Sequence, residues 1–333
     1  MPPSDNPFYR EPLHPNFNRR ALHHDYRLPA KYMLTILKNP DLPPFSQIIG
    51  DPKSIADIQI LLSPLGEAIQ KAIEEWIPLY PIYVPTHIIM PDHIHICVDV
   101  IATLDKGLSR AVSRLMGKCS SIYHHSLPDR LRPEKMTSLF TTGFNDKIAY
   151  TEERWKREKN YTNDNPRRYL IKKHYPDYLR KRWLLTVSGD RQFVMMGNIF
   201  LLKMPHLFRV KTSRHYTARE AIAAMEQWKR ELFNGGIPIS PFIHPHEKEL
   251  KNRAIQEGYS FIRICTHGFA ERAAPTGIEF ELMSEGRLLL IGQPEYSTRK
   301  EDLRYSFAQN LNDLAKEIAD TGNRGVALTI RPV

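Results

Sequence analysis

Two histidines separated by a single residue, His93 and His95, are the side chains with the clearest capacity for chemistry in this chain. They lie in a segment whose isoleucines and valines (Ile94, Ile96, Val98) are typical of a β-strand. Because side chains alternate along a strand, both imidazoles point to the same face. Such a pair suits half of a metal site, although two partly exposed strand histidines without a metal are the alternative. A third ligand and a reactive group are needed to decide.

Tyr161 and Asn165 are the candidates for these missing parts. On a helix they are four residues apart and project from one face. A tyrosine hydroxyl is a weak nucleophile at its ordinary pKa and acts where a cation stabilises the developing charge. An asparagine carbonyl is a hard ligand that suits Mg²⁺ or Mn²⁺ beside imidazole, and such a metal could polarise a scissile phosphate next to the tyrosine. An ordinary helical tyrosine and a helix-ending asparagine before Pro166 are the alternatives.

Positive charge is concentrated around this tyrosine. The net charge is +10, and the segment 154–182 holds eleven Lys or Arg against three acidic residues, with four tyrosines among them. Cations bind phosphates and aromatic rings stack on unpaired bases, so the segment suits single-stranded nucleic acid; a solvated helix face fits the composition equally well. The candidate DNA-binding residues here are Arg157, Lys159, Arg167, Arg168, Lys172 and Lys173.

A second basic row lies on a helix predicted over 104–124. Arg110, Arg114 and Lys118 follow one another at steps of four residues and therefore share one side of that helix. A row of this kind is usually a solvated face. Because it follows the histidine strand directly, it could equally bind a phosphate backbone.

Three motifs together carry a resemblance to a known family. Met90-Pro91-Asp92 precedes the histidine pair, Phe144-Asn145-Asp146 follows, and Tyr161-x-x-x-Asn165-Pro166 comes last. In order and spacing, over about residues 28–183, they resemble the single-tyrosine HUH transposases of the REP-associated type. The resemblance implies a ferredoxin-like fold and an enzyme that cuts single-stranded DNA next to a hairpin. Such an enzyme forms a 5′-phosphotyrosine bond and leaves a free 3′-OH.

Carried over to this chain, the resemblance implies His93, His95 and Asn165 as metal ligands and Tyr161 as the nucleophile. The segment differs from the family pattern at Thr162 and at 167–170, where Arg-Arg-Tyr-Leu follows the proline. Tyr169 and Tyr175 therefore stay open as alternative nucleophiles.

The predicted elements of the first part suit this fold. A strand is predicted over 31–37, a loop over 38–57, a helix from the N-cap Ser63, two short strands within 83–100 and a short strand over 139–144. A helix over 148–163 should end at Asn165-Pro166. The order predicts a small antiparallel sheet with its helices on one face.

Beyond Trp183 the pattern changes to alternating strands and helices. One helix is predicted to begin at the capping box Thr217–Glu220, and two more are predicted over 246–256 and 301–320. Strands are predicted over 259–265, 288–291 and 326–330. Glu279 and Glu281 are expected on a strand, as solvated carboxylates. His244-Pro245-His246 is expected to be a helix-starting turn without a metal. The pattern predicts an α/β, Rossmann-like domain with a largely parallel sheet. The proposed division is an irregular basic arm (1–27), an HUH-like domain (28–183) and an α/β domain of open role (184–333).

Composition narrows the setting. The 41% hydrophobic and 25% charged residues are ordinary for a globular protein, and no apolar run approaches the roughly 20 residues of a membrane span. Three widely spaced cysteines fit a reducing compartment, so a cytoplasmic protein without a membrane partner is expected.

The expected partner is single-stranded or hairpin DNA, and a homodimer that exchanges the tyrosine helix between subunits is possible in so small a domain. Two other functions stay open. The chain could be a domesticated DNA-binding protein that no longer cleaves. Alternatively, its C-terminal domain could bind a ligand of its own while the first domain targets it to DNA.

Overall fold

Four antiparallel strands form the sheet on which the histidine pair lies. In the computed structural model, their order across the sheet is β4-β5-β1-β6. Taken in chain order, the strands are therefore arranged 2-3-1-4 across the sheet, with helices in the two crossovers, which is the ferredoxin-like arrangement. The expected small antiparallel sheet is confirmed. The strands are β1 (Ala30–Leu37), β4 (Ile82–Ile89), β5 (His93–Val100) and β6 (Asn145–Ala149).

The structure describes residues 21, 24–179, 181–185, 192–213, 215–270, 273–294 and 305–321. The chain divides between Lys173 and His174 into two units, each with its own sheet and hydrophobic core. Most of the predicted basic arm and the whole predicted strand 326–330 lie outside the described residues.

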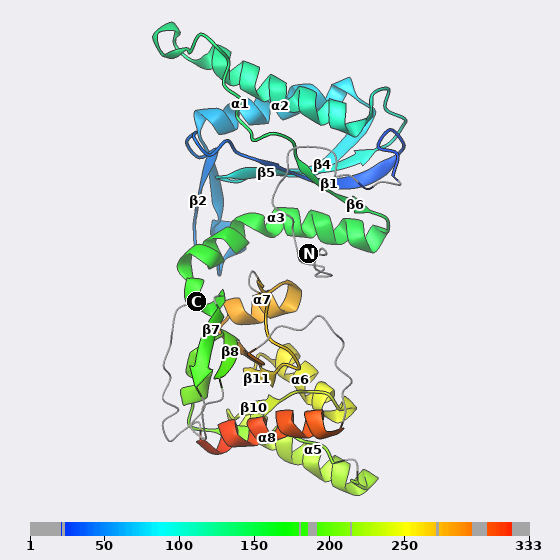
Figure 1. The fold of residues 1–333 in the computed structure, drawn as a ribbon, viewed down its shortest axis with the longest axis vertical. Coiled ribbons are helices and arrows are strands. Elements are labelled where there is room, and N and C mark those ends of the chain that lie inside the picture. Colours follow the sequence, from blue (N-terminus) through cyan, green and yellow to red (C-terminus); the bar gives the residue numbers. More distant parts are fainter. Residues whose placement is uncertain are drawn as a thin grey trace, which may run out of the picture. The chain divides into compact units, whose positions relative to one another are not determined.

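Helices α1 (Pro64–Trp76) and α2 (Gly107–Ser126) cover one face of the first sheet (Figure 1). The Ser63 side chain caps α1 by accepting a hydrogen bond from the Gly66 backbone N–H at 3.3 Å, as predicted. The apolar sides of both helices and alternate residues of β1 and β5 form one core, which includes Tyr32, Leu34, Ile69, Ile73, Ile94, Ile96, Val98, Leu108, Val112 and Leu115.

Helix α3 (Glu152–His174) covers the opposite face of this sheet (Figure 1). Two predictions were therefore wrong: the helices do not all lie on one face, and the tyrosine helix does not end at Asn165-Pro166. A proline inside a helix removes one backbone hydrogen bond and costs about 3 kcal/mol. Burial of Pro166 and Leu170 offsets this cost, because Leu170 packs against Ile48 and Met90.

Strand alternation decides which side chains α3 meets. Ile94, Ile96 and Val98 belong to the core under α1 and α2, whereas Cys97 packs with Met33 and Trp155 on the α3 side. His93 and His95 have the same parity as Cys97 and therefore face α3.

Two short segments of the first unit also differ from the prediction. The predicted loop contains a hairpin of β2 (Ser46–Ile49) and β3 (Gln59–Leu62), whose four-residue strands carry too weak a pattern to be recognised. The predicted strand 139–144 is only a single bridge between Phe140 and Lys38, and the strand of this region is β6. Three short 3-10 helices complete the unit: η1 (Ile55–Asp57), η2 (Ile77–Leu79) and η3 (Asp129–Leu131).

The second unit contains a six-stranded mixed sheet in the order β7-β8-β12-β11-β10-β9. Strands β9 to β12 are parallel, as predicted for this part, whereas β8 and β7 add antiparallel strands beside β12. The strands are β7 (Lys181–Leu185), β8 (Gln192–Gly197), β9 (Leu207–Arg209), β10 (Ile237–Ser240), β11 (Phe261–Ile264) and β12 (Leu288–Gly292).

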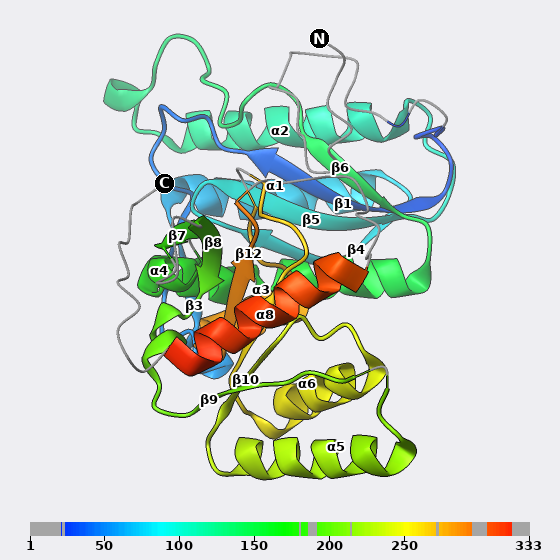
Figure 2. The ribbon, with the colours of Figure 1, turned by 60° about the horizontal axis from the view of Figure 1, so that its bottom comes forward.

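Helices cover both faces of this second sheet. Residues of α5, α6 and α7 pack on one face, and α8 packs on the other, across β9 and β10 (Figure 2). Glu279 and Glu281 lie in α7, so their predicted strand was wrong. The helices are α4 (Pro176–Leu179), η4 (Ile199–Lys203), α5 (Ala218–Phe233), α6 (Pro245–Glu257), α7 (Gly277–Ser284) and α8 (Tyr305–Thr321).

Local signals at the ends of two helices in the second unit are confirmed. Thr217 and Glu220 form the predicted capping box at the start of α5. His244 is the N-cap of α6, and its Nδ1 accepts the backbone N–H of His246 at 3.3 Å, so the second His-x-His motif is a helix start. The buried carboxylate of Glu247 accepts backbone N–H groups from Thr212, Ile243 and His244.

Neither a membrane span nor a disulfide is found in the described residues. None of their helices is long and apolar enough to cross a bilayer. Cys97, Cys119 and Cys265 are all buried and unpaired.

Replacing Ile96 with alanine should lower the free energy of unfolding of the first unit by about 2–5 kcal/mol, because a fully buried side chain leaves a cavity. Chemical denaturation followed by fluorescence measures the change. Tyr83→Ala, on the neighbouring strand with its side chain 60% exposed, is the control and should change this free energy by no more than about 0.5 kcal/mol. Equal losses in the two variants would contradict the assignment of Ile96 to the core.

Candidate metal and nucleophile site

His93 and His95 direct the same ring nitrogen toward one point. Their Nε2 atoms lie 3.1 Å apart. The Nδ1 atom of His93 lies 2.7 Å from the Asp92 carboxylate, and the Nδ1 atom of His95 lies 2.9 Å from the Thr35 hydroxyl. Because Nδ1 of each ring already has a hydrogen-bond partner, Nε2 is the nitrogen of each ring that can bind a cation. The pair could therefore bind one cation between its two Nε2 atoms.

Burial keeps His95 in the neutral form that a metal requires. Its side chain is only 5% exposed, and burial, followed by the proximity of His93, lowers its pKa to about 3. The hydrogen bond with His93 in turn lowers the pKa of Asp92. In metal sites, hydrogen bonds to the second ring nitrogen commonly orient the imidazoles, and Asp92 and Thr35 are placed to do this here.

Thr35 was not predicted as part of the site. It lies directly opposite His95 in the register between β1 and β5. No local pattern shows that a residue 60 positions earlier in the chain is the pairing partner. Asp92 is adjacent in sequence and was recognised only as part of the motif that precedes the histidines.

Tyr161 reaches the histidine pair from α3. Its ring centroid lies 5.8 Å from that of His95, in an edge-to-face arrangement at 65°. The side chain is 38% exposed, so it is open to a substrate while it packs on the site. Two cations flank the ring: the Lys147 ammonium at 5.4 Å and the Arg168 guanidinium at 5.5 Å from its centroid. Positive charge thus lies close to the Tyr161 ring, although the Arg168 guanidinium also lies 3.6 Å from the Asp164 carboxylate.

The two alternative tyrosines have other neighbours. Tyr169 packs beside the cluster of Ile48, Met90 and Leu170. Tyr175 stacks on Tyr178 with ring centroids 5.9 Å apart. Of these three candidate tyrosines, Tyr161 is the one for which the described structure shows a ring contact with the histidine pair.

Asn165 is buried on the side of α3 that faces the sheet. It is 7% exposed, and its Nδ2 atom has no hydrogen-bond partner in the described structure. Thr162, one turn earlier, contacts Cys97 with 3.5 Å between Oγ1 and Sγ, and Leu170, further along, packs against Met90. On the strand, His93 and His95 lie between Met90 and Cys97, so Asn165 lies at the matching level of α3.

The donor set fits a hard divalent cation. A buried amide nitrogen without a hydrogen-bond partner is unfavourable. Rotating the Asn165 amide by 180° exchanges Nδ2 and Oδ1, so that the carbonyl oxygen occupies the unpartnered position. The described residues contain no group of three or more His, Cys, Asp or Glu side chains placed to hold a metal ion together. A metal at this site would therefore depend on the Asn165 oxygen as its third protein ligand, together with the two imidazoles.

The predicted cations of α3 divide into two groups. Arg157, Arg168 and Lys172 are 4, 7 and 11 residues from Tyr161 and share its flank of the helix. The others point elsewhere: Lys159 lies over the Trp155 ring, Arg167 pairs with Asp164 at 2.6 Å, and Lys173 is exposed near the helix end.

The basic row of α2 is not brought to the site. α2 covers the face of the sheet opposite to α3, and Arg110 and Arg114 lie on its solvent side. Lys118 pairs with Glu75 of α1 at 2.6 Å, and Arg114 donates to the Tyr80 hydroxyl at 3.4 Å. The sheet and its core separate this row from the histidines.

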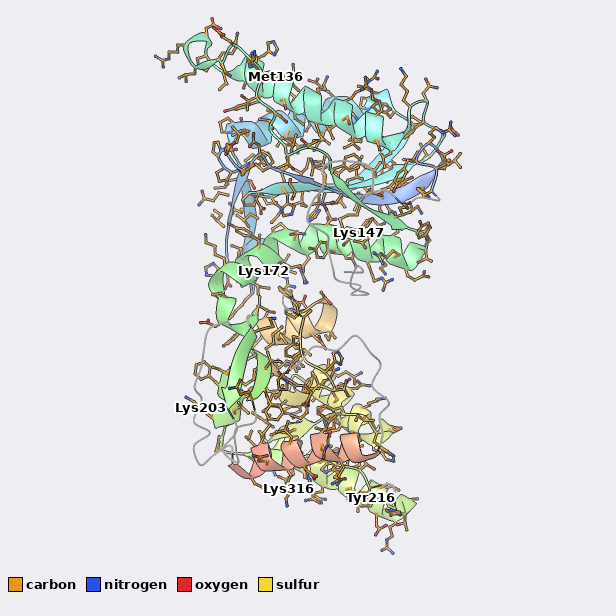
Figure 3. All side chains as sticks on the ribbon, in the orientation of Figure 1. Met136, Lys147, Lys172, Lys203, Tyr216 and Lys316 are labelled. Carbon is orange, nitrogen blue, oxygen red and sulfur yellow. The ribbon has the colours of Figure 1, made fainter. Side chains whose placement is uncertain are left out.

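Lys147 and Glu158 belong to the site but were not predicted. Lys147 lies on β6 opposite Met33, which places it on the α3 face of the sheet (Figure 3). The buried Glu158 carboxylate lies 3.6 Å from the Lys147 ammonium and accepts a hydrogen bond from Arg154 at 2.7 Å. Lys147 directly follows the Phe144-Asn145-Asp146 motif, and that adjacency was the signal available in the sequence.

Comparisons with known proteins add little to this geometry. No family model matches the chain, and no curated protein matches it. Among solved structures, the chain is similar to a REP-associated tyrosine transposase bound to a REP hairpin, with 10% sequence identity and a TM-score of 0.32 over 45% of this chain and 74% of that chain. This is a weak likeness of fold, and it assigns neither a residue nor an activity to this chain.

Replacing His95 with alanine should abolish specific Mn²⁺ binding, because it removes one of the two converging Nε2 atoms. Electron paramagnetic resonance of free Mn²⁺ in a titration measures the binding without any substrate. His87→Ala is the matched control: His87 lies on the neighbouring strand and hydrogen-bonds Gln70 of α1, so it faces the other helix layer. Equal Mn²⁺ binding by the His95 variant and the unchanged protein would rule out this site.

Proposed function

We propose that the first unit is a metal-dependent enzyme that cuts single-stranded DNA and transfers the cut strand through a covalent bond to Tyr161. The observation that carries this proposal is the contact of the Tyr161 ring with His95, whose Nε2 converges with that of His93. A nucleophile, a cation-binding pair and flanking positive charge are thereby combined on one face of the sheet. The motif resemblance adds the substrate class, single-stranded DNA next to a hairpin.

His93, His95 and Asn165 would hold Mg²⁺ or Mn²⁺ in this enzyme. When bound, the cation would polarise the scissile phosphate and neutralise part of its charge. Asp92 and Thr35 keep the two imidazoles oriented with Nε2 toward the cation. The buried position of His95 excludes water from one side of the site.

Tyr161 performs the covalent step. Its hydroxyl oxygen attacks phosphorus and loses its proton to solvent, while the bond from phosphorus to the 3′-oxygen breaks. The 3′-oxygen takes up a proton and leaves as a free 3′-OH, and the 5′ side stays on the enzyme as a phosphotyrosine. Lys147 and Arg168, whose charged groups lie 5.4 and 5.5 Å from the ring centroid, stabilise the negative charge on the phenol oxygen and the phosphate. Attack by the 3′-OH of another strand reverses the step and completes strand transfer.

The strand is proposed to follow the flank of α3 that carries Tyr161. Arg157, Arg168 and Lys172 lie along this flank. Backbone phosphates need cations at intervals, and these residues supply them before and after the nucleophile.

Replacing Tyr161 with phenylalanine should abolish the covalent adduct between the protein and a labelled single-stranded hairpin oligonucleotide in Mg²⁺ or Mn²⁺. The hydroxyl oxygen is the atom that bonds phosphorus, and phenylalanine keeps the ring packed on His95. Adduct is measured on a denaturing gel. Tyr169→Phe and Tyr175→Phe are the controls and should form adduct at the unchanged rate. Steeply salt-dependent DNA binding by the unchanged protein, with no adduct at any metal concentration, would favour a non-cleaving DNA-binding protein instead.

Replacing Arg157 and Lys172 together with alanine should weaken binding of single-stranded DNA and reduce the slope of log affinity against log salt by about 1.4, roughly 0.7 for each lost phosphate contact. The matched control replaces Arg110 and Arg114, which lie on the opposite helix layer, and should leave affinity and slope unchanged. Fluorescence anisotropy at several salt concentrations measures both quantities. A larger effect of the α2 pair would move the DNA path to the other face of the sheet.

A further inference from the structure

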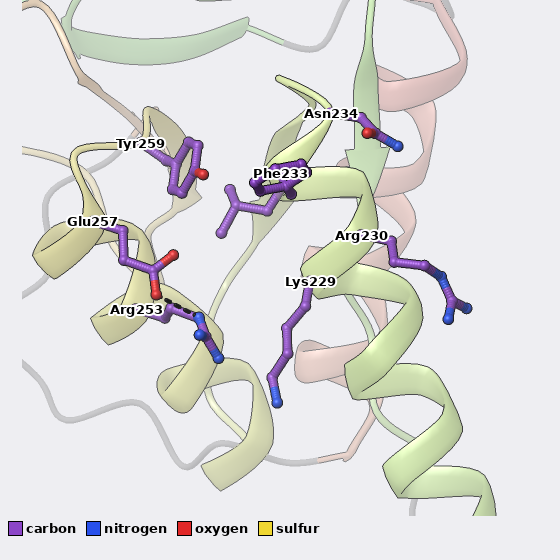
Figure 4. A pocket seen from close by; sticks show the side chains of 8 residues that line it. Lys229, Arg230, Phe233, Asn234, Arg253, Glu257 and Tyr259 are labelled. Atoms are coloured by element: carbon purple, nitrogen blue, oxygen red, sulfur yellow. Dashed lines mark hydrogen bonds and ion pairs between the residues drawn. The ribbon is translucent and has the colours of Figure 1, made fainter.

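A pocket of about 340 Å³ lies in the second unit where α5 and α6 end (Figure 4). The side chains that matter for its chemistry are Lys229, Leu232 and Phe233 of α5, together with Arg253 and Glu257 of α6 and Tyr259 just after it. α5 and α6 lie side by side, so the pocket is formed within a single packed layer. This size suits one flat ring system with its attached groups.

Two aromatic side chains line one end of this pocket. Phe233 is 79% exposed, whereas Trp228 and Leu232 of the same helix are buried. Figure 4 shows the rings of Phe233 and Tyr259 near one another, and Leu232 also lines the pocket. An exposed ring beside a partner ring offers a π-face on which a nucleobase can stack.

Two cations line the other end. Figure 4 shows the heads of Lys229 and Arg253 extending from facing helices toward the same side, whereas Arg230 points away from the hollow. Arg253 pairs with Glu257 at 2.6 Å and Lys229 with Glu226 at 2.9 Å. Exposed ion pairs of this kind are weak, so both cations can exchange their carboxylate for a phosphate.

A second hollow of about 650 Å³ continues from the pocket along α6 and shares Arg253 and Glu257 with it. Pro245, Lys248, Glu249, Asn252 and Gln256 also line it. A cation beside two side-chain amides can bind a further phosphate and the polar edge of a further base. The pocket with Phe233 and this second hollow are adjacent, so two successive nucleotides of one strand could occupy them.

The ends of α5 and α6 fix the orientation of such a ligand. Both helices end at the pocket, where their carbonyl groups carry partial negative charge. A phosphate is disfavoured there, whereas the N–H groups of a base are favoured. The base therefore belongs at the Phe233 end and the phosphate at the Lys229 and Arg253 end.

We propose that this pocket is a binding site for single-stranded nucleic acid, in which a base stacks on the exposed ring of Phe233 beside Tyr259 and the adjoining phosphate contacts Lys229 and Arg253. The site lies in the second unit and needs neither the metal nor Tyr161, so it does not rest on the function proposed for the first unit. It gives the second unit a role of its own in holding a strand.

Hydrogen–deuterium exchange of the full-length chain in EDTA tests this site, because it locates binding and excludes cleavage. Ten-nucleotide dT and rU strands are the probes. Residues 229–234 and 253–259 should become protected from exchange as either strand is added. The strand that protects them at the lower concentration shows whether the site prefers DNA or RNA. A strand of the same length with abasic sites should protect these segments about tenfold less well, because stacking on the rings is lost.

Phe233→Ala should raise the strand concentration for half-protection of these segments about tenfold or more. Ile222→Ala is the matched control, since Ile222 is also a large exposed apolar residue of α5 but does not line the pocket; this variant should leave protection unchanged. Protection confined to the first unit, equal protection by the abasic strand, or protection by a polyglutamate peptide alone would each overturn the proposal.

Discussion

The packing of α3 onto the second face of the four-stranded sheet is the interaction on which the proposed site depends. One face of β5 contributes Ile94, Ile96 and Val98 to the core under α1 and α2, and this leaves His93, His95 and Cys97 for the other face. Trp155, Thr162 and Leu170 bury one stripe of α3 against that face. Only this packing brings Tyr161 to His95, because the two residues are far apart in the chain and no contact within α3 would hold them together.

Burial gives the site its electrical character as well as its geometry. His95 is neutral because desolvation penalises its charged form, and its Nε2, which lies 3.1 Å from that of His93, can therefore bind a cation. Nearby positive charge is held in place by the buried Glu158, which pairs with both Lys147 and Arg154. Lys147 and Arg168 lie near the Tyr161 ring, and each also pairs with an acid at 3.6 Å, Lys147 with Glu158 and Arg168 with Asp164. An anion such as a phosphate is the group that this arrangement favours.

Short-range patterns predicted much of the first unit, and long-range pairing accounts for most of what they missed. Strand alternation, the Ser63 cap and the i, i+4 relation of Tyr161 to Asn165 are local, and each could be read from neighbouring residues. Thr35 and Lys147 could not, because their place at the site depends on which strands pair and in which register. The two basic rows looked equivalent in sequence, and only the layer order separates Arg110 and Arg114 from the histidines.

The misjudged end of α3 shows how tertiary packing overrides a local signal and why that matters for the site. Asparagine before proline disfavours the helical conformation, so a helix end at Asn165 was the reasonable expectation. In the folded unit, α3 instead continues past Pro166, because Leu170 and Ile171 find buried positions beyond it. The proline lacks the N–H that would bond the Thr162 carbonyl one turn earlier. Had the helix ended there, Asn165 would have been a solvated cap. Its continuation buries the amide on the same stripe as Thr162, with one end unpartnered, at the level of the two histidines. The helix thus continues past a helix-breaking residue and buries the polar side chain of Asn165, where an apolar stripe would place a hydrocarbon side chain.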